Sequence, residues 1–471
     1  MKSAAIILFC CLLVGCARFV PKPLSPETNA ANLEARSLTN AALKVFLEKN
    51  LRREISGWPH PLWDFDMLTL AVLYYQPNLA VARAQWNSAQ AGIKTAGGRL
   101  NPSVTAGSAY NSDITSLSPW MPAISFDVPV ETAGKRQRRI EQATHLTDSA
   151  RFSLATAAWQ ARSELRSSLI ESAAAHQRFA LLQGQISIQE QIVNSLEKQA
   201  QAGAIARSEL TPARVTLAKA RLDLADAQTQ FARARVRVAE AIGVPVAALD
   251  EAELSFDPLK DGASVTNLTS SEVRSAALRS RADILGALED YAAAQSALQL
   301  EIAKQFPDVH LSPGYAWNQN QTGDNQWQLG LTVDLPLLNQ NQGPIAEAEA
   351  HRAEVAARFN ALQAKVLAEI ERAVATFQVA EKNRATLQAL AEAQAKQRES
   401  VESQFKAGAA DQLDLQNARL ESITAELVQL DAQIKFQQAA GALEDAVQRP
   451  IETMNAAVIE QRPQAAKENQ P

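Results

Sequence analysis

Three carboxylates follow two glycine turns that occupy equivalent places in the sequence. Glu209 stands six residues after Gly203, and Asp414 stands six residues after Gly408, with Asp411 between the second glycine and Asp414. Carboxylates gathered in one place attract cations through their field alone. Acidic residues in the first turn of a helix also complement its positive N-terminus, which is the structural alternative. Both roles can hold at once.

The remaining reactive residue types do not form a catalytic or metal-binding pattern. Five histidines and four methionines are scattered, and His145, His176 and His351 lie singly on predicted helices. We find no phosphate loop, nucleophile elbow or zinc-binding helix motif. We therefore predict a protein that is not an enzyme and has no resident metal or cofactor. The formal net charge of −5 gives no reason to expect a nucleic-acid partner.

Residues 1–15 are typical of a secretory signal, because a positive start precedes a short apolar run. The run ends in the sequence LVGC at Cys16, which resembles the lipobox of bacterial lipoproteins and implies cleavage and acylation at Cys16. Cys10 and Cys11 would leave with the signal, so no internal disulfide could form. A signal with an accidental cysteine is the alternative. Ala17, in place of an aspartate that would retain the protein at the inner membrane, points to the outer membrane.

Apolar residues alternate with polar or small ones in four short segments, which predict two β-hairpins at 102–130 and 307–337. In the second hairpin the alternation continues to Leu337. Each run is long enough to cross a bilayer, although half of a soluble sandwich would show the same pattern. Aromatic residues lie near the far ends of the strands, as membrane-interface aromatics or as ordinary packing: Tyr110, Trp120, Tyr315, Trp317 and Trp327.

The sequence contains one structural unit as two tandem repeats. Residues match at an offset of 205, as in Pro102 and Pro307, and at 207 within the hairpins, as in Trp120 and Trp327. Each copy is predicted as helix, hairpin, very long helix, turn and helix. Repeat 1 spans 64–248, with helices at about 64–100, 132–202 and 206–243. Repeat 2 spans 270–450, with helices at about 270–305, 344–405 and 412–448. A segment at 16–63 with a short helix near 29–53, a linker at 249–269 and a disordered tail at 451–471 complete the chain.

A helix of about 70 residues is roughly 105 Å long, deeper than an ordinary globular core. The two shorter helices of each copy can pack end to end along the long one. Its apolar residues in repeat 2 recur about every 3.67 residues, which indicates a nearly straight seam: Val355, Phe359, Leu362, Val366, Ile370, Ala373 and Phe377. Such helices suit the wall of a wide tube, and a plain coiled coil is the alternative.

Four strands cannot close a membrane barrel alone, because the smallest has about eight and open edges cannot face lipid. Copies of the chain must therefore complete it. Two copies would give a filled barrel, and three would give twelve strands around a lumen. Physical reasoning predicts an oligomer without deciding its number.

The duplicated layout resembles the TolC family of bacterial outer-membrane efflux proteins. The resemblance implies a mainly α fold with a small β part: a homotrimer with a twelve-stranded β-barrel continued by a long periplasmic α-helical barrel. It also implies a periplasmic adaptor and an inner-membrane pump of the RND type as partners, beside the outer-membrane lipid. Two stretches at strand-to-helix junctions, 130–136 and 337–345, resemble the branch that serves heavy-metal cation exporters.

The same resemblance assigns roles to the turns. They would dock the adaptor and close the tube at the periplasmic end, through Ala202, Gly203 and Ala204 in copy one and Ala407, Gly408 and Ala409 in copy two. Glu209, Asp414 and Asp411 would then ring the constriction. The second acidic position of the family is Pro212 and Asn417 here, which predicts a less charged or looser gate.

Four cations crowd the start of the long helix of repeat 1, where they oppose the helix dipole: Lys135, Arg136, Arg138 and Arg139. They are interpreted as a solvated face, with lipid phosphates as the alternative contact.

The leading hypothesis is a passive exit duct in the outer membrane for heavy-metal cations. The alternatives are a duct of the same fold for drugs or for type I protein secretion, and a lipid-anchored coiled-coil scaffold in the periplasm.

Overall fold

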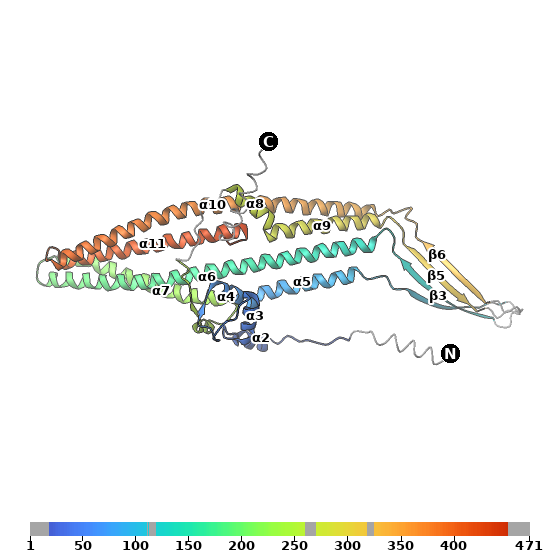
Figure 1. The fold of residues 1–471 in the computed structure, drawn as a ribbon, viewed down its shortest axis with the longest axis horizontal. Helices are drawn as coiled ribbons and strands as arrows, with labels where there is room; N and C mark the ends of the chain where they lie inside the picture. The colour runs from blue at the N-terminus through green and yellow to red at the C-terminus, as the bar shows by residue number, and fades with distance from the viewer. Residues whose placement is uncertain (1–17, 111, 113–118, 260–269, 318–324, 451–471) are drawn as a thin grey trace, which may run out of the picture.

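The computed structural model is an elongated bundle of helices that carries a small sheet at one end (Figure 1). It describes residues 18–110, 112, 119–259, 270–317 and 325–450. The predicted signal, Cys16 and the tail at 451–471 lie outside these residues, as does the linker from residue 260. Among the described helices, none combines the length and the apolar character needed to cross a membrane.

The helices of the two repeats run side by side. In repeat 1, α5 (Pro77–Ala96) and α7 (Arg207–Ile242) both pack along α6 (Lys135–Gln201). In repeat 2, α9 (Ala282–Ala303) and α11 (Gln412–Val447) pack along α10 (Gln342–Lys406). Helix α6 also packs against α9 and α11, so it joins the two repeats (Figure 1). The mainly helical tandem-repeat fold is confirmed.

Each of three helices predicted from the sequence is divided into two helices in the structure. The first, at 64–100, is α4 (Phe65–Tyr75) and α5, because Pro77 drives Gln76 into an extended conformation. The second, at 270–305, is α8 (Ser270–Ser280) and α9, separated by the extended residue Arg281. The third, at 29–53, is α2 (Pro26–Glu34) and α3 (Ala41–Leu51), whose N-termini are capped by separate polar side chains.

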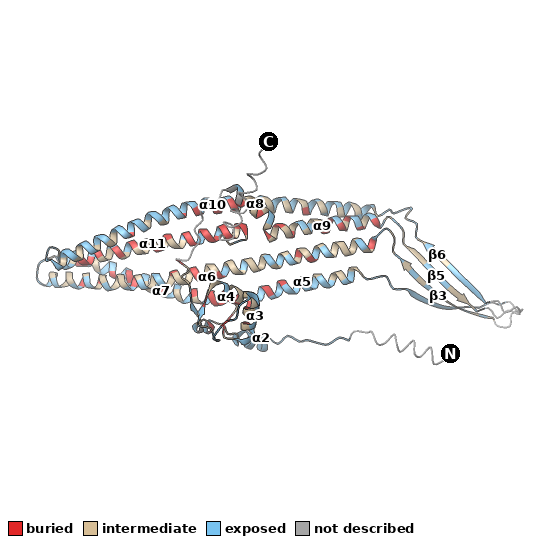
Figure 2. Cartoon of the chain, viewed as in Figure 1, coloured by how far each residue is buried: buried red, intermediate tan, exposed pale blue. Residues whose placement is uncertain are grey.

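The predicted seam of the long helix is buried. Val366 and Ile370 are fully buried, and Val355, Ala373 and Phe377 are buried as well. Phe377 packs against Phe436 of α11, with ring centroids 5.4 Å apart. Buried residues recur along the long helices α6, α7, α10 and α11 while their other faces are exposed (Figure 2), as expected for helices that form a wall.

The sheet contains β2 (Ser103–Tyr110), β3 (Trp120–Val130), β5 (Val309–Ala316) and β6 (Gln326–Val333), antiparallel and in that order. Its register places the four apolar faces predicted from the alternation on one side. The second hairpin was expected to extend to Leu337, but β6 ends at Val333, because Val333 pairs with the first residue of β5, Val309, and no strand lies along the other edge of β6 among the described residues.

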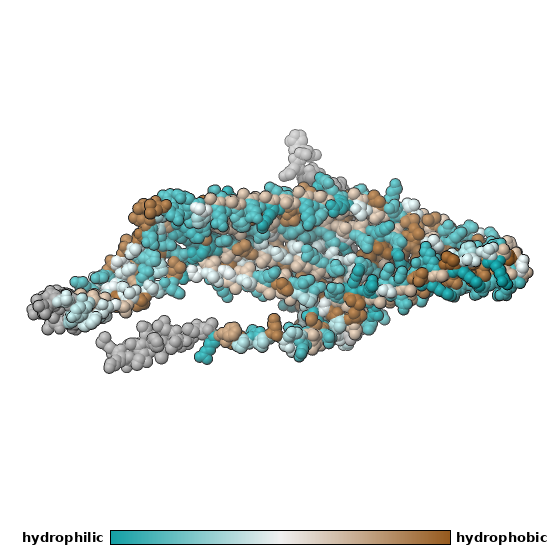
Figure 3. All heavy atoms as spheres, turned by 180° about the vertical axis from the view of Figure 1, so that it is seen from behind, coloured by the Kyte–Doolittle hydropathy of each residue, from teal (hydrophilic) through white to brown (hydrophobic). Residues whose placement is uncertain are grey.

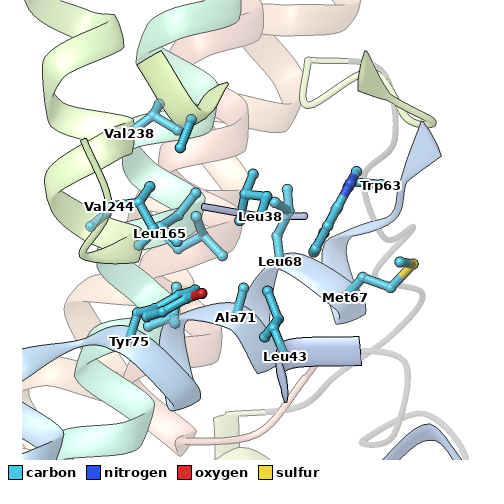
Figure 4. Packing of buried hydrophobic residues seen from close by; sticks show 14 of the residues in the cluster. Leu38, Leu43, Trp63, Met67, Leu68, Ala71, Tyr75, Leu165, Val238 and Val244 are labelled. Atoms are coloured by element: carbon cyan, nitrogen blue, oxygen red, sulfur yellow. The ribbon is translucent and has the colours of Figure 1, made fainter. Parts of the chain in front are cut away.

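The segment before repeat 1 packs against the middle of the bundle (Figure 4). Leu38, Leu43 and Trp63 form one core with Leu165 of α6 and Val238 of α7. The short 3₁₀ helix η1 (Val246–Glu251) leads into β4 (Glu253–Leu254), which forms a two-residue parallel pair with β1 (Leu62–Trp63). The start of the predicted linker is thus part of this core region. Strands of two residues are too short to show a periodic pattern, so the sequence did not indicate them.

Candidate functional site

The two turns at the end of the bundle farthest from the sheet have the same backbone structure. Gly203 and Gly408 adopt left-handed φ values of 77° and 76°. The next residue then donates its N–H to a carbonyl five residues earlier, at 2.9 Å for Ala204 and 2.8 Å for Ala409. This geometry is a Schellman motif, which ends one helix and reverses the chain within a few residues.

The three carboxylates beside these turns cap helices. Asp411 accepts the N–H of Asp414 at 2.7 Å, and Asp414 accepts the N–H of Asp411 at 3.0 Å. Glu209 reaches back to the N–H of Ala206 at 3.4 Å. These acids therefore have the helix-capping role that was the structural alternative to cation attraction. All three side chains remain exposed, so their negative charge is still presented at the tip.

Each turn is bridged by an ion pair that sequence reasoning missed. Arg214 lies 2.6 Å from Glu197, and Arg419 lies 3.1 Å from Glu402. Both pairs join residues 17 positions apart, and the offset of 205 relates one to the other. The spacing of 17 residues and its repetition at the offset of 205 could have indicated these ion pairs from the sequence. Exposed pairs of this kind stabilise weakly, so their main effect is to align the two helices of each tip.

Replacing Gly203 by alanine is expected to lower the free energy of unfolding by about 1 kcal/mol, because a Cβ disfavours the left-handed conformation. Nothing lies within 4 Å of the Cβ position, so backbone strain acts alone. Urea unfolding followed by circular dichroism at fixed protein concentration measures the change. Gly92→Ala is the matched control, since Gly92 is inside α5 with equally open space, and alanine should stabilise it. Equal effects at both sites would contradict the prediction.

The basic cluster at the start of α6 is a joint between strands and helices. Lys135 donates to the carbonyl of Phe306 at 2.6 Å and to Asp308 at 2.8 Å, and Asp308 also accepts the N–H of Thr132 at 2.9 Å. Lys135 is only 7% exposed. The interpretation as a solvated face is wrong for this residue, because its charge is bound inside the chain.

Two arginines complete the joint. Arg136 donates to the carbonyl of Gly97 at 2.7 Å, just beyond the end of α5. Arg139 is paired with Glu131 and donates to the carbonyl of Ala96 at 3.4 Å. Cations that are unfavourable at their own helix N-terminus thus reach the negative C-terminal end of a neighbouring helix. Arg138 pairs with Glu141 one turn along the helix.

The Lys135 pair also sets the ionisation of Asp308. Burial would raise the pKa of this carboxyl, but hydrogen bonds from Lys135 and Thr132 and the charge of Lys135 outweigh it, so the pKa lies below its usual range. Asp308 precedes β5 and lies outside the strands. It therefore stays ionised and holds the lysine.

The predicted interface aromatics form two groups at the far end of the sheet. The rings of Tyr110 and Trp120 are 5.1 Å apart, and Tyr315 lies 4.7 Å from both Trp317 and Trp327. The aromatic rings therefore pack against one another at this end of the sheet, which was the alternative to a membrane-interface role. Trp327 is still 84% exposed, so these rings also present a large aromatic surface to the surroundings.

The opposite face of the sheet carries a polar group that sequence reasoning did not single out. His310 contacts the carboxylate of Asp127 at 3.0 Å, and Ser312 lies 3.4 Å from the same carboxylate. On the helices, His145 contacts Glu289 at 2.7 Å. No set of three or more potential ligands that could hold a metal ion occurs in the described parts of the chain.

Comparisons with known proteins agree with this geometry. The model of the family described as outer membrane efflux protein matches residues 71–244 and 273–447, one segment in each repeat. The pyoverdine export outer membrane protein OpmQ of Pseudomonas aeruginosa is 24% identical over 73% of this chain and 74% of its own length. The cobalt-zinc-cadmium resistance protein CzcC of Cupriavidus metallidurans is 24% identical over 58% of this chain and 62% of its own length.

Solved structures show the same fold. The outer-membrane channel OprN has a TM-score of 0.64 and 19% identity, covering 92% of this chain and 98% of that one. The outer membrane protein VceC of Vibrio cholerae has a TM-score of 0.65 and 19% identity, covering 82% of this chain and 96% of that one. Since the family model matches most of the chain in two equivalent segments, the chain belongs to the outer membrane efflux protein family and is a channel protein, not an enzyme.

Proposed function

We propose that the chain is the outer-membrane channel of a tripartite efflux system, a passive exit duct from the periplasm to the exterior. Three copies form a twelve-stranded β-barrel in the outer membrane, continued by a helical barrel in the periplasm. A lipid on Cys16 anchors each chain. An inner-membrane pump of the RND type drives the cargo through a periplasmic adaptor.

The sheet carries this proposal. One of its faces is apolar along β3, β5 and β6 and, apart from Ser108, along β2, and hydrophobic residues are among those at the surface of this end of the molecule (Figure 3). Leu329 and Leu331 on that face are 79% and 66% exposed. A soluble protein rarely leaves so continuous an apolar surface in water, whereas lipid would cover it. The opposite polar face, with Asp127 and His310, would then line a wet lumen.

The tips support the contact with the adaptor and the gate. Both turns present small residues around an exposed glycine, so a partner can approach the backbone closely. Glu209, Asp411 and Asp414 stand beside them, and a symmetric assembly would gather their charges around one opening.

Heavy-metal cations are the proposed cargo. The similarity to CzcC and the carboxylates at the tips favour them. Small organic molecules are the second candidate, because OpmQ is a pyoverdine export protein. Deletion of the gene is expected to sensitise the cell to zinc, cobalt or cadmium. Sensitivity to drugs alone, or loss of a secreted protein, would assign the channel to a different cargo.

Membrane fractionation tests the channel itself. The protein should co-fractionate with the outer membrane, require detergent for extraction and migrate differently on gels before and after heating. The Cys16→Ser variant, which cannot be acylated, should still require detergent. A Cys16→Ser protein that is monomeric and extractable without detergent would instead identify a lipid-anchored scaffold.

Neutralising the tip carboxylates is expected to reduce cation selectivity. The triple variant Glu209→Gln, Asp411→Ser and Asp414→Gln keeps residues that can still cap the helices while removing three charges per chain. In planar bilayers under a potassium chloride gradient, its reversal potential should move towards zero, because the field at the tip is weaker.

The control variant removes three exposed carboxylates far from the tips, Glu27→Gln, Glu34→Gln and Asp66→Asn. It should leave the reversal potential unchanged. If both triple variants shift the potential equally, the tips do not form the selective constriction.

A further inference from the structure

We propose that β6 of one subunit pairs with β2 of the next in a single register, with Leu335 opposite Ala106 of the neighbouring subunit. In this register Leu331 faces Tyr110 and Leu337 faces Val104. The proposal rests on the oligomeric channel proposed above and specifies how its subunits join.

The sequence repeat relates the strand pairs of the first hairpin to those of the second. Adding 205 to a residue of β2 gives its match in β5, and adding 207 to a residue of β3 gives its match in β6. The pair Val104 with Phe126 then becomes Val309 with Val333, which is observed. Ala106 with Ile124 becomes Leu311 with Leu331, which is observed as well. The two hairpins therefore have identical registers.

The same offsets relate the strand pair between the repeats to the strand pair between subunits. Strand β3 pairs with β5 through Val128 opposite Leu311 and through Ile124 opposite Tyr315. In a ring of alternating repeats, the equivalent joint is β6 with β2 of the next chain. Val128 maps to Leu335 and Leu311 maps to Ala106.

The remaining pairs follow in the same way. Ile124 maps to Leu331, and Tyr315 maps to Tyr110. The outermost pair, Val130 with Val309, gives Leu337 opposite Val104. The observed joint between repeats thereby defines the register of the joint between subunits.

The faces of the strands agree with this register. Odd positions of β6 and even positions of β2 carry the apolar residues, and the proposed pairs join odd to even. A slip of one residue would place apolar side chains opposite polar ones across the barrel wall. Side-chain parity thus excludes odd shifts, and the repeat decides among the even ones.

The early end of β6 supports the proposal. Strand β3 reaches Val130 because β5 pairs with its last residues. The equivalent of Val130 is Leu337, yet the strand ends at Val333 in a single chain. Leu335 and Leu337 are 66% and 77% exposed. The apolar alternation continues through them, so residues 334–337 carry a strand pattern that pairing with a neighbouring subunit would complete.

Disulfide cross-linking tests the register. In the double variant Leu335→Cys and Ala106→Cys, oxidation should link subunits into reducible dimers and trimers, since directly opposed strand residues have Cα atoms within disulfide range. Acylated Cys16 provides no competing thiol. The controls pair Leu335→Cys with Val104→Cys or with Ser108→Cys, two residues away in either direction. Their cross-linking should be about tenfold slower, because diagonal neighbours lie at roughly 7–8 Å.

A second pair keeps the test decisive if the first variant does not assemble. Leu331→Cys with Tyr110→Cys should cross-link as rapidly, and Leu331→Cys with Ser108→Cys should not. Faster cross-linking of a shifted pair, or a trimer that none of the predicted pairs links, would overturn the register while leaving the channel intact. A protein that is monomeric in detergent by light scattering would overturn the oligomeric channel itself.

Discussion

Replacing Glu444 by alanine is expected to destabilise the chain by about 3–5 kcal/mol, because it removes the nearest carboxylate of two largely buried arginines. Glu444 lies on α11 and pairs with Arg162 at 3.1 Å and with Arg166, both on α6. The three side chains are 11%, 18% and 19% exposed. Burial lowers the pKa of Arg166, while the charges of Glu444 and Asp445 oppose that shift. The arginine nevertheless stays charged, so the alanine variant leaves it with the more distant carboxylate of Asp445, 3.7 Å away.

The guanidinium of Arg166 lies directly against Gly441 of α11. A Cβ added at Gly441 would lie 2.1 Å from a terminal nitrogen of Arg166, so this glycine makes room for the guanidinium. Because the network joins α6 to α11, its loss should weaken the packing between the two repeats. Urea unfolding of the detergent-solubilised protein at fixed concentration measures the effect.

Glu421→Ala on the exposed side of the same helix is the control and should change stability by no more than about 0.5 kcal/mol. Glu444→Gln, which keeps a hydrogen-bond acceptor but no charge, should fall between the two. A Glu444→Ala variant as stable as the control would show that the network does not hold the repeats together.

Replacing Asp308 by alanine is expected to cost about 2–3 kcal/mol, because Lys135 loses a charged hydrogen bond within a largely buried joint. The side chains of Lys135 and Asp308 are 8% and 29% exposed. The backbone N–H of Thr132 loses its acceptor in the same variant. The change should therefore loosen the connection between the sheet and α6. The exposed residue Asp226, on α7, gives a matched control as Asp226→Ala.

The same variant should change how stability depends on pH. The pKa of Asp308 is lowered in the folded chain, so its contribution is fully present above the ordinary aspartate value of 3.8. It is lost as the pH falls through the lower folded pKa, because the unfolded chain then binds the proton more readily. The difference in stability between the original protein and Asp308→Ala should be constant above pH 3.8 and shrink below it. A difference that grows on acidification would contradict the assignment.

Much of the architecture was predictable from the sequence, because it depends on the local periodicity of apolar residues and on the tandem repeat. Alternation through Phe126, Leu311 and Leu331 defines a strand face from neighbouring residues alone. The step of about 3.67 residues through Val366, Ile370 and Phe377 defines the seam of a helix in the same way. The turn glycines Gly203 and Gly408 indicate where each helix reverses, since a left-handed conformation favours their residue type.

The partners of the charged residues depended on the tertiary structure. Lys135 is buried because the carbonyl of Phe306 and the carboxylate of Asp308 lie beside it, more than 170 positions away. Arg166 is buried because α11 crosses α6 at Glu444, which lies 278 positions further along the chain. Backbone carbonyls are the same at every residue, and charged pairs so distant have no common period. The path of the backbone alone selects which of them meet, whereas side-chain alternation within a strand or helix needs only its immediate neighbours.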